Sequence, residues 1–308
     1  MGFLDWLAGL LGGDGERAPG RPPSFWRQAP RERRRKLRAT ADHDAGRLAT
    51  YGLPNLRTRD ELAGAMDISR GTLDWLTFAE HADEPLHYIT FAVPKTTGGY
   101  RVLYAPKARL KQAQRWVHRR ILDRVPLPDA VHGFAHGRSI HTNAAQHAGQ
   151  AMVLTADLEN FFPSITYRRV RGIFQAIGYG EEVAIALGLL CTVKPAPKVC
   201  EFLGGQHHRL LPQGAPTSPT LANLACRRLD ARLGGLARAF GCTYTRYADD
   251  LTFSGDEAFE RALPRFLPLL RRIIDEEGFR VNRRKMHFAR RGARQRVTGL
   301  VVNDRPSV

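Results

Sequence analysis

The chain has 308 residues, of which 43% are hydrophobic and 25% charged, and a formal net charge of +17 from 47 Lys and Arg against 30 Asp and Glu. A chain of this length can bury a core without disulfides. The excess positive charge favours a polyanionic partner, nucleic acid before an anionic membrane, and argues against an acidic protein substrate or a free-standing metabolic enzyme.

The cysteines and the apolar segments indicate a cytoplasmic protein. The four cysteines contain no C-x-x-C pair, so we expect free thiols rather than a zinc site or disulfides. No apolar run is long enough for a membrane-spanning helix. The apolar start, residues 1–13, lacks the basic segment and cleavage site of a signal peptide.

Residues 1–57 are predicted to form a basic N-terminal extension. Between Arg21 and Arg38 the chain holds eight basic residues and a single acid, Glu32. This pattern predicts a basic helix that lies on a phosphate backbone. The alternative is a helix face that is simply solvated.

Residues 58–150 are predicted to begin with short helices over residues 58–82. From His87 the apolar residues alternate with a period of two on both sides of Thr97-Gly98-Gly99, which predicts a β-hairpin. Residues 108–124 place apolar side chains at helical spacing among Arg and Lys, which predicts a basic amphipathic helix.

Residues 151–303 are predicted to mix strands and helices. A buried strand over residues 151–157 ends in Asp157, and a hairpin carries Asp249 and Asp250 at its tip. Residues 194–198 are expected to form a turn. Helices are expected over residues 166–178 and 181–193, in a long helix capped by Ser218, and over residues 263–277 as far as Gly278. The last strands are expected within residues 279–289 and 295–303.

Three carboxylates, those of Asp157, Asp249 and Asp250, stand where strands end. Adjacent Asp side chains repel each other, so a hairpin tip with two of them needs a compensating cation. Mg²⁺ binds carboxylates together with phosphate oxygens, and two metal ions can activate a 3′-hydroxyl and stabilise a leaving pyrophosphate. The alternative is a polar turn, where Asp is common.

Several segments, in the expected order, resemble motifs of reverse transcriptases. Tyr247-Ala248-Asp249-Asp250 resembles the Y-x-D-D box, residues 157–165 the first palm motif, and residues 211–223 the P-Q-G motif with its following helix. Asn143-Ala-Ala-Gln-His147 and Val297-Thr298-Gly299 resemble the N-A-x-x-H and V-T-G boxes of retron reverse transcriptases, in particular the myxobacterial type. The resemblance covers about residues 85–303.

The resemblance implies a catalytic centre. Asp157, Asp249 and Asp250 would be catalytic and would hold two Mg²⁺ ions, with the backbone carbonyl of Leu158 as a further ligand. Phe162 would be a steric gate that excludes the ribose hydroxyl, although core packing is its alternative.

The resemblance also implies a nucleotide site and a set of family residues. Lys95 and Arg101 would grip the triphosphate, and Lys285 would lie near the leaving pyrophosphate, with plain surface exposure as the alternative for each cation. The loop that touches the incoming nucleotide would contain Gln213 and Gly214. The family boxes, which could contact RNA, supply Asn143, His147, Val297, Thr298 and Gly299.

Four histidines raise the alternative of a zinc site. His132, His136, His141 and His147 are spaced closely enough for metal ligands. No Cys or acid completes a tetrahedral set, and the resemblance accounts for His147, so we expect no zinc.

The resemblance implies an α+β fold of the right-hand polymerase kind. The fingers and N-terminal helices would occupy residues 58–150, and the palm residues 151–303, as an antiparallel sheet backed by helices. A finger insertion is expected at about residues 178–212. Retron reverse transcriptases continue past the V-T-G box into a helical thumb, which is not expected in this chain, so RNA specificity and activity without a thumb stay open.

The implied function is RNA-directed DNA synthesis by a retron. The enzyme would use dNTPs to copy a structured non-coding RNA into branched, RNA-linked single-stranded DNA (msDNA), and would act with an effector protein in anti-phage defence. Two alternatives stay open: another bacterial reverse transcriptase, such as the group II intron type, and a non-catalytic RNA-binding scaffold.

Overall fold

The computed structural model describes residues 43–77, 86–95, 100–202 and 208–307. These residues belong to one compact unit, Thr40–Val308. The predicted basic helix between Arg21 and Arg38, and the Gly98-Gly99 tip of the first hairpin, lie outside the described residues.

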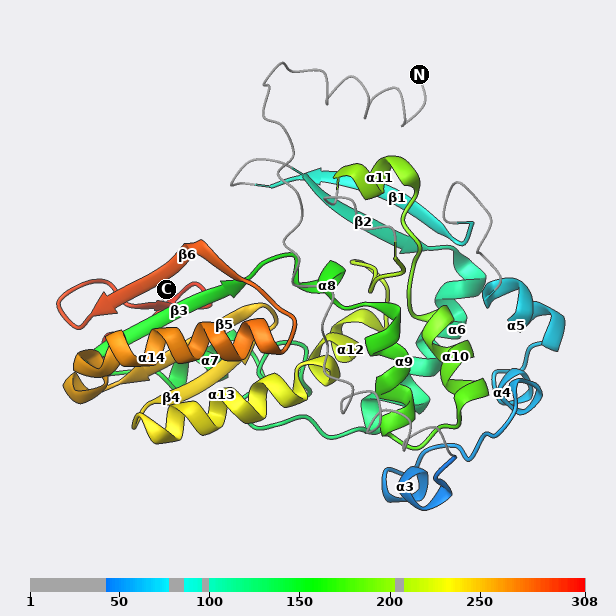
Figure 1. The fold of residues 1–308 in the computed structure, drawn as a ribbon, viewed down its shortest axis with the longest axis horizontal. Coiled ribbons are helices and arrows are strands. Elements are labelled where there is room, and N and C mark those ends of the chain that lie inside the picture. The colour runs from blue at the N-terminus through cyan, green and yellow to red at the C-terminus, as the bar shows by residue number, and fades with distance from the viewer. Residues whose placement is uncertain (1–42, 78–85, 96–99, 203–207, 308) are drawn as a thin grey trace. The chain divides into compact units, whose positions relative to one another are not determined.

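A four-stranded antiparallel sheet organises the second half of the chain (Figure 1). Its order is β4-β5-β3-β6, with β3 at Met152–Leu158, β4 at Thr243–Tyr247, β5 at Asp250–Gly255 and β6 at Val281–Arg290. β3 has a neighbour on each side and is covered on both faces, which explains why its sequence is apolar almost throughout.

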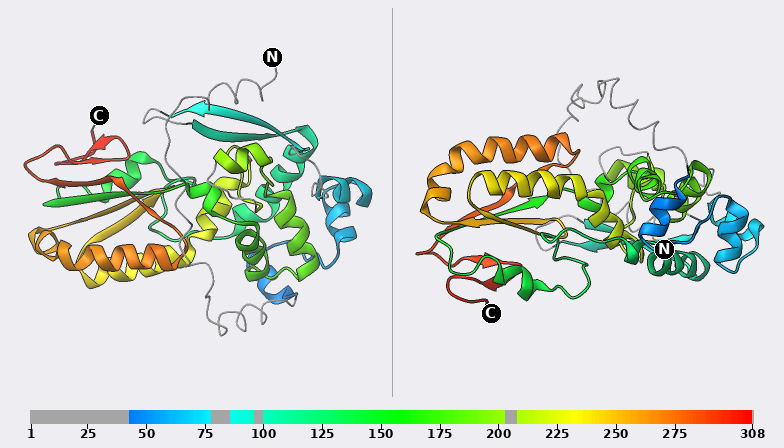
Figure 2. Two further views of the ribbon diagram at one scale, coloured as in Figure 1. Left: turned by 45° about the horizontal axis from the view of Figure 1, so that its top comes forward. Right: turned by 90° about the horizontal axis from the view of Figure 1, so that it is seen from below.

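Different elements cover the two faces of this sheet (Figure 2). α13 (Arg227–Ala239) and α14 (Glu257–Glu276) lie side by side on one face. On the other face lie α7 (Ile140–Ala145) and a small hairpin of β7 (Arg296–Val297) and β8 (Leu300–Val301). Successive residues of β3 point to opposite faces, so Leu154 belongs to the main core and Val153 to a small cluster with Ala144, Val297 and Val302.

The first half of the described chain is mainly helical. A two-stranded antiparallel hairpin, β1 (Tyr88–Pro94) and β2 (Tyr100–Pro106), pairs Val93 with Arg101. The helices outside the sheet region are α3 (Ala45–Thr50), α4 (Arg59–Ala65), α5 (Arg70–Thr77), α6 (Ala108–Arg120), η2 (Leu122–Arg124), α8 (Phe161–Ser164), α9 (Tyr167–Ala176), α10 (Glu181–Leu190), α11 (Pro197–Phe202) and α12 (Ser218–Ala225).

The expected cap at Ser218 is wrong. The Ser218 hydroxyl donates to the carbonyl of Pro212 at 2.6 Å, and Thr217 takes the N-cap position. The long helix predicted there is divided at Cys226 into α12 and α13.

Two further boundaries also differ from the prediction. α14 begins at Glu257, because the Asp256 carboxylate accepts from the backbone N–H groups of Ala258 and Phe259. The expected turn at residues 194–198 runs into α11, which begins at Pro197, a residue whose ring suits a helix start.

One apolar cluster runs from Leu48 in α3 to Phe279 before β6, and includes side chains of the helical region and of the sheet. All four cysteines are free, as expected, and three of them are buried. Within the described residues, no helix has the length and apolar character needed to cross a membrane.

Candidate active site

The fold brings the three predicted carboxylates together. β3 and β5 are antiparallel neighbours, and their register places Asp157 opposite Asp250. The backbone N–H of Leu158 donates to the carbonyl of Asp249 at 3.0 Å, which joins the end of β3 to the hairpin tip. Residues 92 positions apart in sequence, Asp157 and Asp249, therefore meet at one edge of the sheet.

The carboxylates repel one another, and two cations offset part of this repulsion. Desolvation, followed by the charges of Asp249 and Asp157, raises the pKa of Asp250 to about 6. Burial and the charge of Asp157 raise the pKa of Asp249, against the opposing charges of Lys285 and Arg101. The compensating cations that an Asp-Asp tip requires are therefore present.

Lys285 pairs directly with the acidic cluster. Its Nζ donates to Asp157 Oδ2 at 3.0 Å, and the Asp157 side chain is only 12% exposed. This hydrogen bond and the neighbouring carboxylates raise the pKa of Lys285, so the ammonium form is favoured.

The carboxylate oxygens are the kind of donor that a hard divalent cation prefers, and a cation, Lys285, already lies beside Asp157. Among the described residues, no group of three or more His, Cys, Asp or Glu side chains is arranged to hold a metal ion. The same finding applies to the histidines that raised the zinc alternative; His132 Nδ1, for example, shares a hydrogen bond of 2.9 Å with Thr142 Oγ1.

The hairpin tip that carries Asp249 is a two-residue turn in a strained conformation. Tyr247 pairs with Asp250, and Ala248 between them has φ of +56°, which is costly for a residue with a side chain. Gly133 packs directly against this turn: a Cβ there would lie 2.4 Å from the backbone nitrogen of Ala248. The close approach requires glycine.

A buried ion pair supports the same turn. Arg246 is fully buried, and its Nε and Nη2 donate to the two carboxylate oxygens of Asp230 at 2.8 Å each. Its Nη1 donates to the carbonyl of Ala248 and to Asn223 Oδ1, both at 3.0 Å. Arg246 therefore ties the tip to α12 and α13, an arrangement that the sequence reasoning missed.

The predicted nucleotide-binding residues differ in whether they interact with the three carboxylates. The structure places the Arg101 charge where it acts on Asp249. Gln213 accepts at its carbonyl from the backbone N–H of Tyr104 at 2.8 Å, and Gly214, with φ of +111°, lies against the Tyr104 carbonyl. The loop of the P-Q-G motif is thereby attached to β2. Lys95 is exposed at the end of β1, and no contact links it to the carboxylates.

The Asn143–His147 box lies beneath the β4–β5 hairpin, with Asn143, Ala144 and His147 buried and the two residues between Ala144 and His147 exposed. His147 Nδ1 and Nε2 form hydrogen bonds of 2.7 Å with Ser254 Oγ of β5 and Thr245 Oγ1 of β4. Burial, with a smaller effect from His132, lowers the pKa of His147 to about 3, so the ring is neutral. Asn143 is also fully buried, and neither atom of its amide has a partner among the described residues.

The second family box packs against the first. Val297 is buried with Ala144, and Thr298 Oγ1 donates to the carbonyl of Ile140 at 3.3 Å. Thr298 and Gly299 both have positive φ, +48° and +88°, which suits the tight turn between β7 and β8. Two boxes that are distant in sequence thus form one unit on the sheet.

Comparison with known proteins agrees with the motifs. The family model described as reverse transcriptase (RNA-dependent DNA polymerase) matches residues 93–302. The chain is 49% identical to the retron Mx65 reverse transcriptase of Myxococcus xanthus, in a match that covers 89% of this chain and 64% of that relative. It is 44% identical to the retron Mx162 reverse transcriptase of the same organism, over 85% of this chain and 56% of the relative. It is 36% identical to the retron Ec86 reverse transcriptase of Escherichia coli, over 84% of this chain and 75% of the relative.

The chain therefore spans less than two thirds of the length of the two Myxococcus relatives, and three quarters of the Escherichia coli one. The family match over residues 93–302 includes the three carboxylates, the P-Q-G segment and both retron boxes. The chain belongs to the retron reverse transcriptases.

Proposed function

We propose that the chain carries out RNA-directed DNA synthesis in a retron. The observation that carries the proposal is the meeting of Asp157 and Asp250 in register on adjacent strands, with Asp249 at the tip between them and Lys285 beside them. Identity of 49% to a retron reverse transcriptase supports it.

In this proposal Asp157, Asp249, Asp250 and the Leu158 carbonyl would hold two Mg²⁺ ions, which when bound would activate a 3′-hydroxyl and stabilise the leaving pyrophosphate. The charge of Lys285, which here pairs with Asp157, would then be available for the leaving pyrophosphate. Arg101 and Lys95 bind the triphosphate, while Gln213 and Gly214 contact the incoming nucleotide.

The finer description of the fold belongs to the same proposal. Residues 58–150 act as fingers and residues 151–303 as palm. The palm is the four-stranded sheet backed by α13 and α14, and the β1–β2 hairpin presents Arg101 to the palm. The N-terminal residues 1–57 add positive charge for RNA.

The retron-specific steps belong to the same proposal, and the similarity to retron reverse transcriptases and the two family boxes support them. The template is a structured RNA, the product is msDNA, and the complex acts in the cytoplasm with an effector protein in anti-phage defence. The unit formed by α7, β7 and β8 is the part that distinguishes this chain from other reverse transcriptases.

The catalytic part of the proposal is tested by Asp249→Asn combined with Asp250→Asn. We expect loss of DNA synthesis on an annealed RNA template and DNA primer, with RNA binding retained. The matched control is Asp123→Asn with Asp304→Asn, which makes the same charge change at two exposed residues. Equal synthesis by the two double variants would remove the carboxylates from the mechanism.

The retron part is tested on nucleic acid that copurifies with the protein from its host. Digestion with DNase, RNase and debranching enzyme should reveal a short DNA joined to RNA through a debranchable link. RNA alone, together with inactivity on the annealed template, would favour the RNA-binding scaffold.

A further inference from the structure

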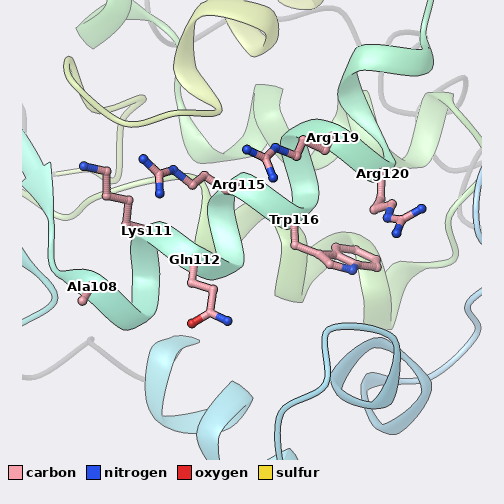
Figure 3. Close-up of a pocket in the computed structure, with 7 residues that line it drawn as sticks. All are labelled: Ala108, Lys111, Gln112, Arg115, Trp116, Arg119 and Arg120. Carbon is pink, nitrogen blue, oxygen red and sulfur yellow. The ribbon is translucent and has the colours of Figure 1, made fainter.

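α6 carries a row of cations that the proposed chemistry does not use. Lys111, Arg115 and Arg119 follow one another at intervals of four residues, and all three are exposed. Their side chains point to the same side of the helix (Figure 3). Four residues advance an α-helix by about 6 Å, so the three charges form a line along the helix.

A hollow of about 740 Å³ lies along this row. Among the described residues, those that line it belong to α6 and include Arg120, Gln112 and Trp116 beside the row. The described part of this lining contains four cations and no acid. Trp116 is half-buried against the core, so the cations dominate the exposed surface.

Within the part of the chain that the structure describes, none of Lys111, Arg115, Arg119 and Arg120 has a carboxylate within 4.0 Å. Other arginines of this region are paired; Arg59 and Arg70, for example, contact Asp74. The positive potential of α6 is thus not neutralised locally.

The stability of α6 does not explain Lys111 and Arg115, although Arg119 lies in the last turn, where a cation suits the helix dipole. No acid occurs in its 13 residues, and its first turn contains Arg109 and Lys111. Cations at a helix N-terminus oppose the helix dipole, and like charges four residues apart repel each other. α14 follows the favourable pattern instead, with Glu257 and Glu260 in its first turn.

The row is also distinct from the cations of the acidic cluster. The positive charges that act on Asp249 and Asp250 come from Lys285 and Arg101, and no residue of α6 is among them. The chain therefore has a second positive surface apart from the three carboxylates.

We propose that the α6 face formed by Lys111, Arg115 and Arg119 binds the phosphate backbone of a double-stranded stem of the RNA, separately from the carboxylate site. The identity of the polyanion rests on the proposed function. Arg and Lys suit phosphate. A single half-buried Trp does not provide the stacking surface that single strands use, and the face lacks the large exposed apolar residues of membrane-binding helices.

The test compares two triple variants with the same loss of charge in the full chain. The first is Lys111→Gln, Arg115→Gln and Arg119→Gln. The control is Arg261→Gln, Arg265→Gln and Arg271→Gln, three exposed arginines of α14. The probe is a long hairpin RNA, and its affinity is measured over a range of salt concentrations.

We expect the α6 variant to lose about tenfold or more in affinity and to lower the slope of log K against log salt by about 2 to 3. The control should change little. The melting temperature of the α6 variant should equal or exceed that of the wild type, because repulsion within the helix is relieved.

Extension of a short annealed template and primer separates this surface from catalysis. The α6 variant should extend it at the wild-type rate. The proposal would be overturned if the α6 variant lost extension while its affinity for the hairpin RNA stayed unchanged. Equal losses of affinity in both triple variants would also overturn it. So would a loss of binding to phosphatidylserine vesicles with unchanged affinity for RNA. If the wild type bound the hairpin through α6 but failed to extend a primer, the proposed function alone would fail.

Discussion

At the scale of residues, two neighbouring phenylalanines follow the strand that carries Asp157 and differ in burial. Phe161 is 3% exposed and packs near Phe279, so it belongs to the core. Phe162 is half-buried and meets Phe134 edge to face at 6.4 Å, and Phe134 is 48% exposed. Phe162 is therefore at the border between core and solvent, where a ligand can reach it.

We expect Phe162→Ala to raise ribonucleotide incorporation about tenfold or more, because removing the ring opens space for a 2′-hydroxyl. The ratio of incorporation of ATP and dATP opposite the same template base measures it. Phe161→Leu serves as the control, since it loosens the core without changing sugar selection. Unchanged discrimination in Phe162→Ala would assign Phe162 to packing.

The ionised carboxylate of Asp250 should lower the stability of the folded protein, because it is desolvated and lies beside two other carboxylates. Its pKa of about 6 in the folded protein lies above its ordinary value of 3.8. The folded protein thus binds more protons than the unfolded chain between these values, and this carboxylate lowers stability as the pH rises through them. In the absence of divalent cations, we expect Asp250→Asn to raise the melting temperature at pH 8 by about 2 °C.

Thermal unfolding at several pH values checks this prediction. The gain should shrink toward pH 4, where the wild-type carboxyl is already protonated in the folded state. Mg²⁺ should stabilise the wild type more than the variant, since a ligand that binds only the folded state adds to its stability. Asp304→Asn, at an exposed site, should match the wild type throughout.

At the scale of elements, α7 is joined to the sheet by the packing of Ala144 on Val153 and by one neutral histidine. His147 joins the segment after α7 to both β4 and β5, whose connecting turn carries Asp249. We expect His147→Ala to cost about 2–4 kcal/mol of unfolding free energy, because it leaves a cavity and two buried hydroxyls without this partner. His136→Ala, at an exposed histidine, should stay within about 0.5 kcal/mol.

The same residue predicts a pH effect of opposite sign to that of Asp250. The pKa of His147, about 3 in the folded protein, lies below its ordinary value of 6.5. The unfolded chain takes up a proton between these values, so stability falls as the pH drops from 6.5. Denaturant unfolding at pH 7 and pH 5 measures how much unfolding free energy is lost on acidification. This loss should be smaller for His147→Ala than for the wild type, and equal losses would contradict a neutral buried ring.

The helices and strands could be predicted where the pattern of apolar residues within the element itself indicates them. The alternating pattern predicts both hairpins, and it places Asp157 and Asp250 at strand ends that prove to be paired. The support beneath the hairpin was not predictable, because Arg246 and Asp230 read locally as an exposed strand cation and a helix acid. Their 2.8 Å contacts arise only when α13 packs on β4. Positive φ at Ala248 gives no signal either, since Ala rarely adopts it.

At the scale of the whole molecule, the helical region and the sheet region share one apolar core and are therefore not expected to fold independently. One apolar cluster connects α3, the helical region, β3, β5 and α14 without interruption, from Leu48 to Phe279. Chains beyond about 150 residues often unfold in steps, but a shared core couples its parts. The four cysteines are free, so no disulfide constrains the unfolded chain.

We therefore expect residues 43–307 to unfold in one cooperative transition. Trp75 and Trp116 report on the helical region, and Cys242 reports on the sheet region beside β4. In a background of Trp6→Phe and Trp26→Phe, tryptophan fluorescence and the reactivity of the Cys242 thiol should give the same urea midpoint, because loss of either region exposes the core of the other. Cys242→Ser corrects the thiol signal for the three buried cysteines. Two separated midpoints would show that the helical region and the sheet region are independently stable, and that the continuous cluster does not couple them.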